Sequence, residues 1–482
     1  MRKAFIYYFM AILLLAGCAS VPDRDLARTR ESPVIKTEEA LSQEYFEEGQ
    51  WPDKNWWEMF GDPQLSALIE RALNENPSLL QARTRIDYAI QFAQTLRARL
   101  FPELHANFFE EWEHLSKNGV YRSFFPLMNP EEIPATLDQI DLTLNFTYEF
   151  DFWGKNRNLF QAALGEARAA YAEEQQANLV MATLVAQTYI SLQAKLNQLS
   201  ILQKRVAQRE QLVQLNQSRY TRGVENNYPV LASRTTIHQE RQALLKLEQD
   251  IAIDKHLLNH LVGLGPDAPS LDTELSVSFN RPFSLPSHLS CDLLARRPDL
   301  IAQIWHVESS AHAIGAAKAD FYPSINLIAF AGLESIEFSK LFKISSRTGG
   351  LVPAIHLPIF TAGRLRANLQ AKVATFNQAV YGYNELVLNA AKEVADQLVT
   401  MQKTVARLND QLIAVEDVSA QYKLLSARQA KGIDTMLSVI DQQEQLLDAQ
   451  FQLINFQRDH LLSVVNLIKA LGGGYSECED QL

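Results

Sequence analysis

The sequence has few cysteines, no excess of basic charge, and no long apolar run after its first residues. Three of its 482 residues are cysteine, so disulfides do not hold a chain of this length together. The formal net charge is −11, which argues against nucleic acid as a partner. No run of about 18 apolar residues follows residue 17, so the sequence predicts no transmembrane helix beyond that point.

Two long intervals also lack proline. None of the 18 prolines falls in residues 135–228 or 359–482. Helix interiors exclude proline, and both intervals are rich in good helix formers with apolar residues at three- and four-residue spacing. The sequence therefore predicts helices over Lys155–Arg222 and Arg364–Lys431, each roughly 100 Å long at about 1.5 Å per residue. Such helices need partners along their whole length.

The first 18 residues have the pattern of an export signal followed by a lipidation site. Two basic residues precede an apolar run that ends at Leu15 and is too short to span a membrane as a mature helix. The sequence Leu-Ala-Gly-Cys matches a bacterial lipobox, so we expect cleavage before Cys18 and acylation of its thiol. Ala19 stands where aspartate would signal retention in the inner membrane, so we expect anchoring in outer-membrane lipid. The alternative is an ordinary signal peptide with an incidental cysteine.

A stretch of strict alternation occupies residues 141–152, DLTLNFTYEFDF. Its even positions carry Leu, Phe or Tyr, and its odd positions carry Asp, Thr, Asn or Glu. Successive side chains of a strand point to opposite faces, so this segment predicts a strand with one apolar and one polar face. A transmembrane β-barrel has such strands, with lipid outside and water inside. A half-exposed strand of a soluble β-sandwich is the alternative.

The chain also repeats itself. Arg219 and Gly223 recur as Arg428 and Gly432 at an offset of 209 residues. The chain is thus two copies of one unit, which runs helix, strand, loop, strand, very long helix, glycine turn, helix. Four strands per chain cannot close a barrel that encloses a channel, so the barrel must be shared between chains.

The predicted organisation follows from these boundaries. It comprises a signal peptide (1–17), a lipidated N-terminal linker or belt (18–55), a first repeat (56–264), an inter-repeat belt (265–289), a second repeat (290–471) and a C-terminal tail (472–482). Cys291 and Cys478 fall at the leftover segments that would meet at the belt, where the periplasm permits a disulfide. Two unpaired thiols are the alternative.

Several motifs, in order along nearly the whole chain after the signal, resemble the signature segments of TolC-like outer-membrane efflux factors, in particular the lipoprotein branch that serves multidrug and metal efflux. They are Trp56-Trp57-x-x-Phe60-Gly61-Asp62-Pro63, Asp151-Phe152-Trp153-Gly154, Arg296-Arg297-Pro298-Asp299-Leu300, Phe321-Tyr322-Pro323-Ser324 and Leu471-Gly472-Gly473-Gly474-Tyr475. The resemblance implies a membrane α+β fold, in which two tandem repeats give four strands of a trimeric 12-stranded outer-membrane barrel above a long periplasmic α-helical tunnel. It also implies a passive duct that works as a homotrimer with a periplasmic adaptor and an inner-membrane transporter. Tyr475 departs from the tryptophan usual in the family.

The resemblance assigns roles to two groups of residues. The turns at Arg219, Gly223, Arg428 and Gly432 are where the adaptor would dock; a plain helix hairpin is the alternative. Three residues that share a helix face, Leu437, Asp441 and Glu444, would constrict the periplasmic mouth. Related sequences often carry Arg at the position of Glu444, so here we expect two stacked carboxylate rings whose repulsion raises some pKa values and favours cations. The alternative is ordinary solvated helix residues.

The sequence offers no catalytic, metal or cofactor site. Gly472–Gly474 closes a helix with no strand before it, which favours a helix cap over a phosphate-binding loop. His256 and His260 have the spacing of zinc ligands, but no glutamate lies between them and no third ligand is evident. We therefore expect no enzyme. Besides the efflux duct, two functions remain open: the exit duct of a type I protein-secretion system, and a structural envelope lipoprotein.

Overall fold

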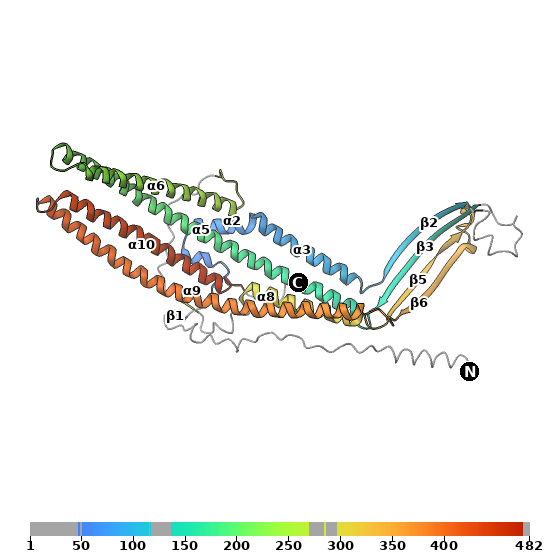
Figure 1. The fold of residues 1–482 in the computed structure, drawn as a ribbon. Helices are drawn as coiled ribbons and strands as arrows, with labels where there is room; N and C mark the ends of the chain where they lie inside the picture. Colours follow the sequence, from blue (N-terminus) through green and yellow to red (C-terminus); the bar gives the residue numbers. More distant parts are fainter. Residues whose placement is uncertain are drawn as a thin grey trace. The chain divides into compact units, whose positions relative to one another are not determined.

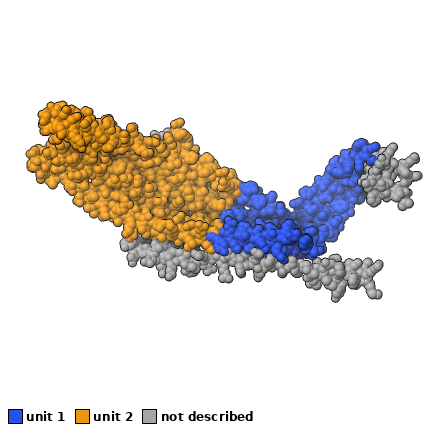
Figure 2. Space-filling model, in the orientation of Figure 1, with its two compact units in different colours: residues 1–28, 87–167, 305–381 blue, residues 29–86, 168–304, 382–482 orange. Residues whose placement is uncertain are grey.

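The computed structural model describes residues 47–48, 51–114, 116, 136–268, 284–285 and 296–475. The chain divides into two compact units, coloured separately in Figure 2. Unit 1 comprises residues 1–28, 87–167 and 305–381, and unit 2 comprises residues 29–86, 168–304 and 382–482. Cys18, Cys291 and Cys478 lie outside the described residues, and so do the predictions of lipidation and of a disulfide.

The elements follow the order expected for two repeats (Figure 1). The first copy contains α2 (Pro63–Glu75), α3 (Pro77–Ala98), β2 (Glu103–His114), β3 (Thr136–Phe150), α5 (Lys155–Thr221) and α6 (Tyr228–Leu261). The second contains α8 (Pro298–Ala319), β5 (Ser324–Ser335), β6 (Arg347–His356), α9 (Arg364–Ala430) and α10 (Met436–Ala470). Short pieces complete the set: the 3₁₀ helices η2 (Trp56–Phe60), η3 (Phe338–Lys340) and η4 (Ile344–Ser346), and the parallel two-residue pair β1 (Glu47–Glu48) and β4 (Ser284–Leu285).

The strands of unit 1 form one antiparallel sheet in the order β2-β3-β5-β6. Its register aligns the apolar positions across all four strands: Leu104 lies opposite Phe146, Phe146 opposite Ala329, and Ala329 opposite Leu351. Residues directly opposite in a ladder share a face, so the predicted alternation produces one continuous apolar face. Within the described residues, β2 and β6 each have one edge without a partner strand.

The predicted strand over 141–152 is confirmed, but its ends differ. β3 begins earlier, at Thr136, and ends at Phe150. Asp151 leaves the strand because its carboxylate accepts hydrogen bonds from the backbone N–H groups of Asn156 (3.0 Å) and Arg157 (2.9 Å) at the start of α5. These N–H groups have no partner inside the helix, so this carboxylate fixes the change from strand to helix.

The helical part of unit 1 packs α8 against α9. Ile314 and Ala317 of α8 form a buried cluster with Leu369 and Val373 of α9. The aspartate-phenylalanine-tryptophan-glycine motif is held to the second repeat, since the Trp153 ring stacks on Tyr322 at 4.8 Å and its Nε1–H donates to the Pro323 carbonyl at 2.7 Å.

The two long helices are confirmed at 67 residues each, within one residue of their predicted ends. The shorter helices α3 and α6 meet end to end, since the Asn76 side chain, just before α3, donates to the Leu261 carbonyl at the end of α6 at 2.8 Å. Within the described residues, no helix is both long enough and apolar enough to cross a membrane.

Two sequence motifs of unit 2 are anchored by buried polar contacts. Asp62 is 2% exposed; it caps α2 by accepting from the backbone of Gln64 and Leu65, and it accepts a hydrogen bond from the Tyr189 hydroxyl at 2.9 Å. Burial, with this contact, raises the pKa of Tyr189. Arg297 is buried between Asp299, Glu393 and the Ala470 carbonyl. These contacts tie the starts of α2 and α8 to the long helices.

Candidate functional site at the helix turns

Both long helices end in the same turn. Gly223 and Gly432 have φ of 71° and 75°, in the left-handed region that a side chain disfavours. The N–H of Gly223 donates to the Tyr220 carbonyl (2.9 Å) and that of Val224 to the Arg219 carbonyl (3.0 Å). The same pair of bonds recurs 209 residues later around Gly432. These two hydrogen bonds form the Schellman motif, which ends a helix.

The arginines of the two turns are engaged within their own turns. Arg219 pairs with Glu225 at 2.6 Å, and Arg428 pairs with Asp434. The hydrogen bond that Arg428 donates to the Asp434 carboxylate raises the pKa of Arg428. The repeat thus preserves an arginine and an acid six residues apart, and the pair braces each turn. An adaptor would meet braced turns rather than free guanidinium groups.

The predicted gate face lies on the first turns of α10, after the turn at Gly432. Leu437 is half-buried and Asp441 is exposed. Glu444 lies nearly one turn further along, and its carboxylate pairs with the Arg209 guanidinium of α5. The expectation of two uncompensated carboxylates per chain is therefore wrong at Glu444, because a cation from another helix neutralises it.

Arg209 belongs to a polar contact between α5 and α10, which we call the α5–α10 clasp and define by Arg205, Gln208 and Arg209 with Ile440, Glu444 and Asp448. Arg205 pairs at 2.7 Å both with Asp448 of α10 and with Glu240 of α6. The Gln208 amide donates to the Ile440 carbonyl. The clasp joins the helix hairpin of the first repeat to that of the second.

The charges of the clasp are partly buried. The side chains of Arg209 and Glu444 are 15% and 24% exposed. Burial lowers the pKa of Arg209 and nearby Arg205 adds to this, whereas the carboxylates of Glu240, Asp441 and Asp448 oppose it. These acids partly offset the effect of burial on the pKa of Arg209, and Asp441 acts on it through charge alone, without a hydrogen bond of its own in the described part of the chain.

Sequence reasoning missed the arginines of the clasp. Arg205 and Arg209 are four residues apart on a helix that carries many charged residues, so nothing local marked them. The partner of Arg209, Glu444, is 235 residues away in the sequence. The internal repeat could have indicated these arginines. Acidic residues on a helix face in only one copy suggest that a cation in the other copy pairs with them.

The comparisons with known proteins identify the family of the chain. The model of the family described as "Outer membrane efflux protein" matches residues 68–264 and 289–473. The multidrug resistance outer membrane protein MdtP of Escherichia coli is 31% identical to this chain over 474 residues. The alignment covers 96% of this chain and 94% of MdtP. The probable efflux pump outer membrane protein SepC of Pseudomonas putida is 32% identical over 429 residues, covering 89% of this chain and 87% of its own.

Solved structures give the same result. The outer membrane protein VceC of Vibrio cholerae superposes with a TM-score of 0.75 at 33% identity, covering 88% of this chain and 100% of its own. The CmeC outer membrane channel of Campylobacter jejuni has a TM-score of 0.83 at 21% identity, which bears on the fold alone. The predicted fold class is confirmed: two tandem repeats supply four strands of a trimeric 12-stranded barrel and a long helical tunnel. The chain belongs to the outer membrane efflux protein family, whose members are outer-membrane efflux ducts.

Proposed function

We propose that three copies of this chain form a passive exit duct for drugs or other small molecules, which an inner-membrane pump delivers through a periplasmic adaptor. The observation that carries the proposal is the register of the sheet, which collects the apolar side chains of four strands on one face. With three copies, that face meets lipid and the opposite face lines a water-filled passage. The duct performs no catalysis. The names of MdtP and SepC support drugs as cargo.

Each chain is proposed to be attached to the outer membrane by a covalently bound lipid in addition to its strands. Acylation of Cys18 would attach each chain to the outer membrane independently of its strands, and three chains would supply several acyl groups per trimer. The lipobox and the residue after it support this part of the proposal.

The turns at Gly223 and Gly432 are proposed as the adaptor-docking ends. Each glycine is followed by an exposed apolar residue, Val224 at 67% and Ile433 at 62% exposure. Arg219 and Arg428 hold the turn shape by pairing with Glu225 and Asp434 rather than by contacting the adaptor. Two equivalent turns per chain would give a trimer six docking positions.

The gate is proposed to form at Leu437 and Asp441, while Glu444 is ion-paired with Arg209 and does not contribute a free charge. Threefold symmetry would turn the exposed Asp441 into a ring of three carboxylates, which favours cations in the pore. The first repeat has Tyr228 and Ala232 at the equivalent positions, so only α10 brings an acid to the ring.

Conductance in planar bilayers tests the duct. We expect purified trimers to open ion-conducting channels, and the Asp441→Asn variant to conduct with a weaker cation preference. Folded trimers that never conduct would instead support a structural envelope lipoprotein. Export of an unfolded protein substrate, without any effect of the chain on drug susceptibility, would favour a type I protein-secretion duct.

A further inference from the structure

The loop between β5 and β6 lies at the end of the sheet that is remote from the helices of unit 1. β5 begins shortly after α8, and β6 ends shortly before α9, so both strands meet the helices at their other ends (Figure 1). In the proposed duct, the loop therefore reaches the outer surface of the outer membrane.

This loop has a compact structure of its own, built on η3 and η4. The N–H of Lys340 donates to the Glu337 carbonyl at 3.0 Å. The Lys340 carbonyl in turn accepts from the N–H of Lys343 (2.9 Å) and from the Ser346 hydroxyl (2.8 Å). The side chain of Leu341 is 1% exposed. These contacts hold the loop so that it presents a defined set of side chains.

The side chains that the loop presents outward include large apolar ones. Phe338, Phe342 and Ile344 are 61%, 72% and 76% exposed. Trp112, near the same end of the sheet on β2, is also exposed. Exposed apolar patches mark contacts with proteins or membranes, and membrane β-barrels carry aromatic residues where lipid meets water. This end of the sheet therefore has the composition of a lipid–water boundary.

Two cations of the loop region have no ion pair in the part of the chain that the structure describes. Lys340 pairs with Glu337 at 2.6 Å, so these two charges offset each other. Lys343 and Arg347 are both exposed, and no described acid lies within ion-pair distance of either. Their charges are therefore free to attract an anion from outside the chain.

Arg347 lies in a row of apolar residues on the sheet. In the ladder it is opposite Leu333, which is opposite Leu142, which is opposite Phe108. Residues opposite one another share a face, so Arg347 belongs to the apolar face. A basic side chain facing lipid is costly at the middle of a bilayer but costs little near its surface, where the long stem lets the charge reach the headgroups. Arg347 thus fits the level of the lipid headgroups.

The acids at this end of the sheet lie away from these two cations. Glu334 and Asp141 are opposite each other on the polar face. Glu110 and Asp138 share the apolar face but belong to β2 and β3, at least two strand spacings, or about 10 Å, from β6. Beside β6, the described residues therefore combine apolar surface with positive charge. We call this surface the β6 rim and define it by Phe338, Phe342, Lys343, Ile344 and Arg347.

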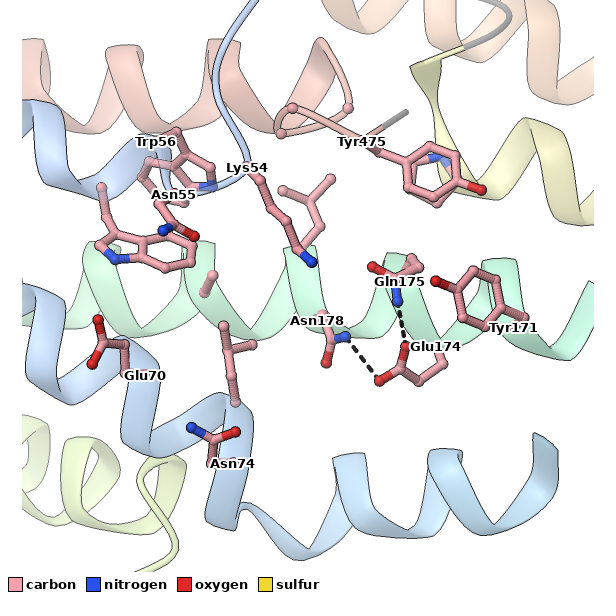
Figure 3. A pocket seen from close by; sticks show the side chains of 18 of the residues that line it. Lys54, Asn55, Trp56, Glu70, Asn74, Tyr171, Glu174, Gln175, Asn178 and Tyr475 are labelled. Atoms are coloured by element: carbon pink, nitrogen blue, oxygen red, sulfur yellow. Dashed lines mark hydrogen bonds between the residues drawn. The ribbon is translucent and has the colours of Figure 1, made fainter. Parts of the chain in front are cut away.

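The most buried charge around the cavity of unit 2 differs from the cations of the β6 rim, because the chain itself uses it. The cavity has a volume of about 530 Å³. The Glu174 carboxylate on its wall is 5% exposed and accepts hydrogen bonds from Gln175 (2.7 Å) and Asn178 (2.9 Å) (Figure 3). This charge serves packing within the chain, whereas Lys343 and Arg347 are open to a partner.

We propose that the β6 rim binds a phosphorylated lipid of the outer leaflet, with phosphate at Lys343 and Arg347 and the acyl chains along the apolar face of the sheet. The inference rests on the proposed duct, which makes that face the lipid face. The two free cations match phosphate, to which a guanidinium can donate two parallel hydrogen bonds. The apolar row that ends at Arg347 favours a lipid over a protein partner. Lipid A, an acylated disaccharide with two phosphates, has this chemistry.

Native mass spectrometry of intact trimers tests the proposal. Trimers in a polyoxyethylene detergent are titrated with diphosphoryl lipid A, and the copies bound to each trimer are counted. The comparison probe is lipid A from which both phosphates have been removed. It should bind roughly 30-fold more weakly, because each basic side chain near an anionic lipid contributes about fivefold. Equal binding of the two lipids would overturn the proposal.

The double variant Lys343→Gln/Arg347→Gln provides the specific signature. Its affinity for diphosphoryl lipid A should fall roughly 30-fold, while its affinity for the dephosphorylated lipid should stay that of the parent. The control Lys403→Gln/Lys423→Gln removes two exposed cations of α9 in unit 2 and should bind both lipids like the parent. Unchanged affinity of the rim variant would overturn the proposal. Its failure to form trimers would also do so, since the two cations would then serve the contact between subunits.

Conductance of the same trimers separates this inference from the duct itself. Trimers that conduct but do not distinguish the two lipids would overturn the lipid site alone. Trimers that bind diphosphoryl lipid A selectively but never conduct would overturn the duct and support the site.

Discussion

Replacement of Arg209 by methionine should weaken the contact between the two helix hairpins. The variant removes the guanidinium from the α5–α10 clasp and leaves the Glu444 carboxylate, 24% exposed, without its partner. An exposed ion pair contributes under about 1 kcal/mol, whereas breaking a fully buried one costs roughly 3–5 kcal/mol. The intermediate burial of this pair places the cost at about 1–3 kcal/mol per chain.

That cost acts on the gate only if the clasp forms in the closed state and breaks in the dilated one. A difference of about 1–3 kcal/mol then shifts the closed-to-open equilibrium of each chain roughly 5- to 150-fold. Single-channel recording in planar bilayers measures this shift as an increase in open probability or mean conductance. The double variant Arg209→Met/Glu444→Gln removes the unpaired carboxylate as well, so it should open less readily than the single variant.

Arg241→Met is the matched control. Arg241 pairs with Glu210 at 2.7 Å, but both side chains are about half exposed and the pair joins α5 to α6 inside one hairpin. Its loss should cost less than about 1 kcal/mol and leave the channel unchanged. If Arg209→Met opens no more readily than Arg241→Met, the clasp does not hold the gate.

Three further predictions concern other parts of the chain. Cys18→Ser should abolish palmitate labelling while trimers still form; persistent labelling would contradict the proposed anchor. Gly432→Leu should strain a left-handed position at a cost of about 1 kcal/mol, keep trimers intact and reduce crosslinking to the adaptor. Gly265→Leu, at an open position without positive φ, is its control, and equal crosslinking would count against docking at the turn. The hydrogen bond from His306 lowers the pKa of Glu166, so Glu166 stabilises the fold above its ordinary pKa and this stability is lost as pH falls through the lowered value. In the Glu166→Gln variant, the melting temperature should therefore fall less steeply as the pH is lowered. An unchanged dependence on pH would contradict this role of Glu166.

The periodic parts of this fold could be predicted from the sequence. The absence of proline over two long intervals rich in helix formers predicted α5 and α9, because proline is so poorly tolerated inside helices, and the predicted ends lie within one residue of the observed ones. The alternation in residues 141–152 gave the face of β3, because one residue of slippage would turn every side chain to the other face. Its exact end was missed because Asp151 is recruited by the backbone of the next helix.

The contacts between distant helices could not be predicted. Tyr189 donates to Asp62 across 127 residues, and Arg209 reaches Glu444 across 235. Such pairs depend on how one 67-residue helix is placed along its neighbours, and a shift of a single turn would bring different side chains together.

The clasp also changes the electrostatics expected at the pore mouth. The sequence alone suggests two acids per chain on the face of α10, hence six charges in a trimer. With Glu444 neutralised by Arg209, the face retains Asp441, exposed and without an ion pair in the described part of the chain. Three carboxylates repel one another far less than six, so a closed ring of Asp441 is easier to maintain at neutral pH. In the proposed gate, Arg209 would therefore join the two hairpins and also reduce the repulsion between acidic side chains at the mouth.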